Sequence, residues 1–111
     1  MNKQDLIEYC LSFPNTYWDT PFPPSKDGSI WTLIRIRGNK KAFAWIYERN
    51  DKLCINIKTD LDKVIFLREV YSDLIPGYHM NKLHWSTIML GGDVPVSETK
   101  QLIGESYNLC T

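Results

Sequence analysis

Apolar and polar positions alternate along residues 30–58, and this period of two predicts three antiparallel strands. The strands are expected at Ile30–Arg37, Lys41–Glu48 and Leu53–Lys58. Gly38-Asn39 can form the first turn because both residues tolerate a positive φ, and Arg49-Asn50-Asp51-Lys52 can form the second. Aromatic and β-branched residues are frequent in all three segments, as a pleated sheet favours. The pattern therefore indicates a three-stranded meander.

Alternation also gives the predicted meander two faces. If both turns have two-residue loops, one face holds small and aliphatic side chains: Ala42, Ala44, Ile46, Leu33, Leu53, Ile55 and Ile57. The other face holds larger or more polar side chains: Phe43, Trp45, Tyr47, Cys54, Asn56 and Lys58. We expect the helices over Ala42 and Ala44, because small residues let a helix approach closely. A three-residue loop at either turn would shift the register and exchange these partners.

Three other segments have the apolar spacing of helices. Asn2, Asp60 and Ser97 can cap them. Pro14 closes the first helix, and the second extends to about Tyr71. The apolar stripes expected to face the core are Leu6, Ile7, Cys10 and Leu11 in the first helix, Leu61, Val64 and Ile65 in the second, and Leu102, Ile103, Tyr107 and Cys110 in the third.

The remaining segments complete the predicted topology. Two more strands are expected, one at Asn15–Trp18 and one from Leu83 or Trp85 to Leu90. Pro21–Pro24 contains three prolines and forms an irregular loop, which Phe22 is expected to pin to the core. Pro76-Gly77 is expected to be a turn. The order of elements predicts one α+β domain over residues 1–111: an antiparallel β-sheet (a three-stranded meander plus a later strand) packed with about three helices.

The balance of charge excludes the class of strongly basic proteins. Thirteen basic and thirteen acidic residues cancel, whereas proteins that bind nucleic acid mainly through phosphates usually carry a basic excess. A nucleic-acid role would therefore need a local basic patch. No apolar run approaches membrane-spanning length and no signal peptide is evident, so we expect a cytoplasmic protein with no membrane contact. A monomer is favoured, with the oligomeric state left open.

The three cysteines and two histidines do not indicate a metal or another cofactor. Cys10, Cys54 and Cys110 are isolated in apolar contexts, so we expect small buried hydrophobes and no zinc site. His79 and His84 lack the i, i+4 spacing of a helical metal pair and have no carboxylate in their segment.

Catalysis is not favoured, although the sequence does not decide whether the protein is an enzyme. Cys54 lies in no catalytic motif, and Ser86 lies within a strand without a nucleophile elbow.

The segment from Pro76 to Leu90 has the most unusual polar chemistry of the chain. With Lys58, it could form an anion-binding patch whose members are His79, Asn81, Lys82 and His84. Trp85 could add a packing or stacking surface. The alternative is that Asn81 and the histidines cap loop backbone while Trp85 fills the core.

The first hairpin and the neighbouring turn are the most basic part of the chain. Arg35, Arg37, Lys40 and Lys41 lie around Gly38-Asn39, and Arg49 lies at the neighbouring turn. A basic hairpin can lie along a nucleic-acid backbone or in a groove. Trp45 or Tyr47 on the open face of the sheet could stack on the bases of a single strand. The alternative is that these cations are solvated and discourage edge-to-edge aggregation.

Several short motifs occur in an order that resembles the MmcQ/YjbR family over nearly the whole chain. They are Pro21-Phe22, Phe43-Ala44, Asn56-Ile57-Lys58, Pro76-Gly77-Tyr78-His79-Met80-Asn81-Lys82, His84-Trp85 and Ser106-Tyr107. The resemblance implies a CyaY-like, or "double wing", α+β fold, whose bacterial members are commonly labelled DNA-binding proteins by fold analogy. The iron handling of frataxin-like relatives is not implied, because the first helix carries only Asp5 and Glu8 as acidic residues.

Three hypotheses follow. The leading one is a non-enzymatic binding module of the MmcQ/YjbR type that contacts nucleic acid, DNA in particular, through the basic hairpin and residues 79–84. The second is a protein-interaction module that uses the open aromatic sheet face. The third is a small-anion binder or enzyme with a pocket near Lys58, His79 and Lys82.

Overall fold

The computed structural model describes residues 1–111 as a six-stranded antiparallel sheet with three helices. Its elements are α1 (Lys3–Leu11), β1 (Thr16–Asp19), β2 (Thr32–Ile36), β3 (Ala42–Arg49), β4 (Lys52–Lys58), α2 (Leu61–Val70), β5 (Leu74–Pro76), β6 (Trp85–Met89) and α3 (Val96–Cys110). The strand order is β1-β2-β3-β4-β6-β5, and every neighbouring pair is antiparallel. The predicted α+β class is therefore confirmed.

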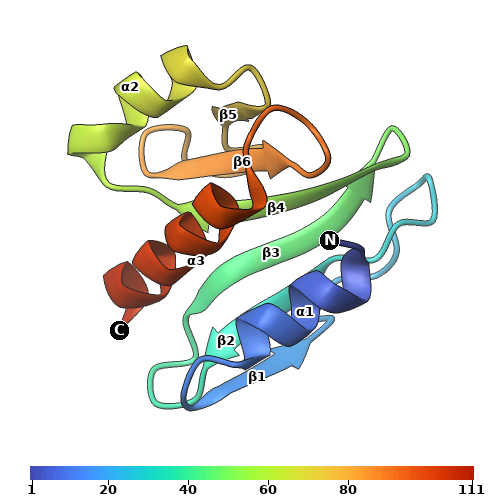
Figure 1. The fold of residues 1–111 in the computed structure, drawn as a ribbon. Coiled ribbons are helices and arrows are strands. Elements are labelled where there is room, and N and C mark those ends of the chain that lie inside the picture. Colours follow the sequence, from blue (N-terminus) through green and yellow to red (C-terminus); the bar gives the residue numbers. More distant parts are fainter.

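The helices cover one face of the sheet. Figure 1 shows α1 and α3 across this face, with α2 beside β5 and β6 at one end. The core between helices and sheet is a single cluster of buried side chains that includes Leu6, Ile46, Ile55, Ile88 and Ile103. No helix packs over the opposite face, which we call the open face.

Helix α1 begins where its sequence predicts. Asn2 Oδ1 accepts a hydrogen bond from the Asp5 backbone N–H at 2.8 Å, and the Asp5 carboxylate accepts one from the Asn2 backbone N–H at 3.1 Å. This reciprocal capping box satisfies backbone donors that the first turn leaves free. The helix ends at Leu11, and it buries Leu6 and Cys10.

Helix α3 begins one residue before the predicted cap. Its N-cap is Pro95, no side chain caps it, and Ser97 lies inside the first turn, so the prediction for Ser97 was wrong. Pro95 ends the preceding loop with φ of −59°, which suits entry into a helix. Further along the helix, the buried Ser106 hydroxyl donates to the Phe43 carbonyl at 2.7 Å and accepts from the Lys58 N–H at 2.9 Å. It thereby joins β3 to β4 at the end of their ladder.

A bulge in the first hairpin changes the predicted faces. The connection from Arg37 to Lys41 is longer than two residues, and its positive φ falls on Lys40 rather than on Gly38. Ile34 pairs with Ala44 but Arg35 pairs with Ala42, so Phe43 is an extra residue on β3. Phe43 therefore turns to the helix side, where its ring lies 5.2 Å from that of Tyr107.

The same bulge places Leu33 on the open face, directly opposite Trp45. Ala42 pairs with Arg35 and also lies on the open face. The expected positions of Leu33, Ala42 and Phe43 were thus wrong, because all three depended on a two-residue loop. In the second hairpin Asn50 and Asp51 both have positive φ, as a two-residue turn requires. Trp45 pairs with Asn56 there, which confirms that the two residues share a face, as predicted.

Helix α2 packs on a different stripe from the predicted one. Val64 and Leu67 are buried, whereas Ile65 is 67% exposed and Leu61 is also exposed. The helix lies at the edge of the sheet against β5, so only a narrow stripe meets the core. Arg68 fixes it in place, because its Nη2 donates to the carbonyls of Lys82 and Trp85 and to the Ser86 hydroxyl.

Strand β5 was not predicted. Leu74–Pro76 pairs with β6 at the sheet edge, and Pro76, expected in a turn, is its last residue. Proline is tolerated there because an edge strand does not need every N–H for the ladder. None of the helices is both long enough and apolar enough to cross a membrane.

Candidate functional site

Aromatic rings gather on the open face. Trp31 stacks on Tyr47 with ring centroids 3.8 Å apart, and Trp45 stands nearly perpendicular to Trp31 at 6.3 Å. Phe22 stacks on Trp45 at 5.8 Å. Together with Tyr78 these rings line a cavity of about 420 Å³, which we call the aromatic hollow. Its floor is Tyr47, which is fully buried beneath Trp31.

A closed hydrogen-bond network supports this floor. Asn56 Oδ1 accepts from the Tyr47 hydroxyl at 2.7 Å and from the Thr87 hydroxyl at 2.6 Å, while Asn56 Nδ2 donates to the Tyr78 carbonyl at 2.9 Å. The Tyr78 N–H donates to Thr87 Oγ1 at 2.9 Å. Burial raises the pKa of Tyr47 to about 12, so its hydroxyl stays a donor at neutral pH. The network fixes the backbone of Tyr78 at the edge of the hollow.

The turn before β6 delivers His79 to the same hollow. A Cβ on Gly77 would lie 2.9 Å from the Cβ and carbonyl of Trp85, so only glycine fits this close approach. His79 has φ of +59°, a conformation that costs a non-glycine residue energy and often occurs at functional positions. Its ring lies 4.1 Å from Tyr78 and 6.2 Å from Trp31.

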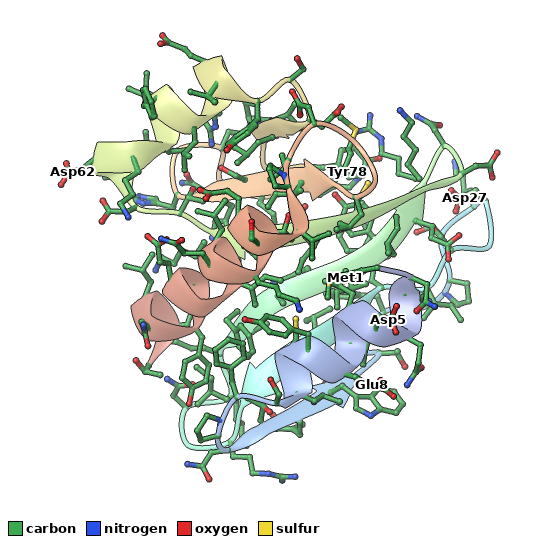
Figure 2. The ribbon with its side chains drawn as sticks, viewed as in Figure 1. Met1, Asp5, Glu8, Asp27, Asp62 and Tyr78 are labelled. Atoms are coloured by element: carbon green, nitrogen blue, oxygen red, sulfur yellow. The ribbon has the colours of Figure 1, made fainter.

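The rim of the aromatic hollow carries both signs of charge. The Arg49 guanidinium lies 3.9 Å from the centre of the Tyr78 ring, a cation–π contact. Asp27 and Glu48 supply carboxylates, and Figure 2 shows Asp27 near the β3–β4 hairpin. Hydrogen bonds from the Ser29 hydroxyl and N–H lower the pKa of Asp27, which keeps it ionised.

A second cavity, of about 350 Å³, adjoins the first and is lined by four cations. We call it the basic hollow, and its cations are Arg35, Lys40, Lys41 and Lys58. Phe22 and Trp45 line both hollows. Asp19 pairs with Arg35 at 2.8 Å, whereas the three lysines form no ion pair. The structure therefore brings together most of the cations that the sequence singled out.

Arg37 lies apart from the basic hollow. Its guanidinium lies 5.3 Å from the centre of the Tyr17 ring on the edge strand β1.

The other polar residues of the segment before β6 serve its backbone. Asn81 Oδ1 accepts from the N–H groups of Leu83 and His84, and Lys82 Nζ donates to the Gly77 carbonyl at 3.0 Å. Neither Asn81, Lys82 nor His84 lines the aromatic or the basic hollow. Lys58 and His79 line different hollows, so these residues do not form one common pocket.

The thiols are placed for packing. All three cysteines are free and buried. Burial raises the pKa of Cys10 to about 12 and also raises the pKa of Cys54 and Cys110, which disfavours the reactive thiolate. No group of three or more His, Cys, Asp or Glu side chains is arranged to hold a metal ion.

Sequence reasoning missed Trp31 as a site residue and assigned Phe22 only to anchoring a loop. Trp31 lies two residues before Leu33 and therefore on the same face. Because the bulge was not predicted, the sequence did not place either residue on the open face. The carboxylates at the rim gave no sequence signal, because Asp27 comes from an irregular loop that only the fold brings to the sheet.

Fold and surface together define a small antiparallel α+β domain whose uncovered sheet face combines aromatic rings with lysines. The family model described as YjbR matches residues 11–109, so the chain belongs to the YjbR family. It is 29% identical to the protein YjbR of Escherichia coli (strain K12) over 96% of this chain and 85% of that protein. It is 33% identical to the protein YbdF of Escherichia coli O157:H7 over 98% of this chain and 87% of that protein.

Solved structures show the same fold. A crystal structure of a Pseudomonas syringae protein has 29% sequence identity and a TM-score of 0.84, with all of both chains covered. A Deinococcus radiodurans protein with the domain DUF419 has 28% identity and a TM-score of 0.80 over 96% of this chain and 75% of that one.

Proposed function

We propose that this protein is a non-enzymatic binding module that holds single-stranded nucleic acid across its open face. The observation that carries the proposal is the juxtaposition of the two hollows. The basic hollow supplies cations for phosphates, the aromatic hollow supplies rings for bases, and Phe22 and Trp45 form the wall between them. Proteins that bind single strands combine these two features.

Charge supports this arrangement despite a net charge of zero. Lys40, Lys41 and Lys58 have no carboxylate partner, so their charges are available to an anion. A local cluster of cations can hold phosphates although the net charge of the protein is zero. Salt screens electrostatic interactions beyond about 10 Å at ~0.1 M, so distant acidic residues have little effect on the cluster.

Recessed rings favour a single strand over a duplex. The bases of a duplex are stacked on each other and cannot enter a cavity, whereas a single strand can turn its bases outward. Trp31 and Trp45 lie within the hollow rather than on a protruding hairpin tip. The face is therefore suited to unpaired bases.

Fluorescence anisotropy of a labelled single strand tests the proposal. We expect binding at ~50 mM salt that weakens steeply as salt rises. The triple variant Lys40→Gln, Lys41→Gln, Lys58→Gln should reduce the log–log salt slope by about 2, since each lost phosphate contact to a single strand contributes roughly 0.7.

The matched control is Lys3→Gln, Lys63→Gln, Lys100→Gln, which removes the same charge from the three helices. This variant should keep the wild-type slope. Absence of binding at ~50 mM salt, or equal loss in both triple variants, would refute the proposal.

A protein-interaction module on the same face is the second candidate. It is favoured by the exposure of Phe22, whose side chain is 45% accessible beside Trp45. Such a contact would depend on apolar burial and would change little with salt. The salt dependence of binding therefore separates the two candidates.

A further inference from the structure

We infer that the aromatic hollow is a pocket for one unstacked guanine. The inference builds on the proposed function, because it names the base that the bound strand would present there. It rests on three observations: the arrangement of the rings, the acceptors at the rim, and the position of Arg49.

The rings form a corner that suits a planar group. Trp31 and Trp45 are 87° apart, and Tyr47 closes the floor beneath Trp31. A flat base can stack on one indole while its edge meets the other. The volume of about 420 Å³ lies within the range of small-molecule sites.

The rim offers carboxylate acceptors to the edge of that base. Both hydrogen bonds from Ser29 go to Oδ1 of Asp27, which leaves Oδ2 free, and Glu48 forms no ion pair or side-chain hydrogen bond. A carboxylate only accepts hydrogen bonds, so it needs a partner with adjacent donors. Among the common bases, guanine alone places two donors, N1–H and the 2-amino group, side by side on its Watson–Crick edge.

Arg49 discriminates against other ligands of aromatic pockets. Its guanidinium already lies over Tyr78, so a quaternary ammonium would meet a like charge there. Guanine instead presents O6 and N7, the acceptor pair that arginine commonly binds. Phosphate is disfavoured in this hollow by Asp27 and Glu48, and it has the basic hollow next to it.

Mononucleotides test the pocket independently of strand binding. Quenching of tryptophan fluorescence should show GMP binding about tenfold or more tighter than AMP, the discrimination expected from one bidentate contact. IMP lacks the 2-amino group and should bind more weakly than GMP. Ribose 5-phosphate has no base to stack on the rings, so it should not quench the tryptophan fluorescence.

The double variant Asp27→Asn, Glu48→Gln should abolish the preference for GMP over AMP. The matched control Asp62→Asn, Glu69→Gln, which removes two exposed carboxylates of α2 outside both hollows, should keep it. Both changes in the double variant are conservative and exposed. Equal binding of GMP and AMP, no binding of either, or an unchanged preference in the double variant would overturn the guanine pocket.

Oligonucleotides keep this outcome separate from that of the proposed function. An oligothymidylate with one central dG should bind more tightly than the same strand with a central dA. If both strands bind equally, the pocket is refuted and strand binding stands. If GMP is preferred but neither strand binds, strand binding is refuted and the pocket stands.

Discussion

At the scale of single residues, Asn56 has the largest organising role on the open face. The sequence places it correctly on that face, but its polar character alone suggests an exposed side chain. In the structure it is fully buried, because Trp31 covers Tyr47 and Tyr78 crosses from the turn before β6. The alternation of a strand predicts the face to which a side chain points. Whether that side chain is buried depends on distant segments that pack over it, so the hydrogen-bond network of Asn56 could not be predicted from the sequence.

Removal of this amide should destabilise the fold. Asn56→Ala leaves the buried Tyr47 hydroxyl without its acceptor, and an orphaned buried polar group costs roughly 1–3 kcal/mol. Urea denaturation should show this loss in the free energy of unfolding. Asn108→Ala is the control, because that side chain is exposed, and it should change stability by no more than about 0.5 kcal/mol. Equal effects of the two variants would contradict the role assigned to Asn56.

At the scale of elements, features that depend on neighbouring residues could be predicted from the sequence, whereas features that depend on contacts between distant segments could not. The cap at Asn2 and the turn at Asn50-Asp51 depend on neighbours in the chain, and both occur as predicted. The bulge at Phe43 depends on aromatic packing against Phe13 and Tyr107, which are distant in sequence. Strand β5 is short and exists only because β6 offers it an edge.

Helix α2 gives this contrast a direct test, because its apolar residues divide between core and solvent. Leu67→Ala removes a buried side chain and should cost about 2–5 kcal/mol. Ile65→Ala changes a side chain that is 67% exposed and should stay within about 0.5 kcal/mol. Thermal denaturation of both variants measures the difference. A larger loss of stability in Ile65→Ala than in Leu67→Ala would contradict the observed packing, because it would mean that Ile65 faces the core as the sequence predicted.

At the scale of the whole molecule, the distribution of charge matters more than its sum. The sequence identified the cations of the first hairpin and Lys58, but it did not reveal that they converge beside Trp45. Convergence follows from the sheet order. Arg35 lies on β2, Lys40 and Lys41 lie in the turn that leads into β3, and Lys58 ends β4, and these three strands are neighbours. Asn81 and Lys82 illustrate the opposite case, since the fold uses them to support a loop.

The central claim is that the open face, rather than the helices, binds single strands. Two-dimensional ¹H–¹⁵N NMR during titration with a short oligonucleotide tests it most directly. We expect the largest shifts at the indole N–H groups of Trp31 and Trp45 and at the amides of residues 35–41, with α1 and α3 nearly unchanged. Shifts concentrated on the helices, or no shifts at saturating oligonucleotide, would contradict the account.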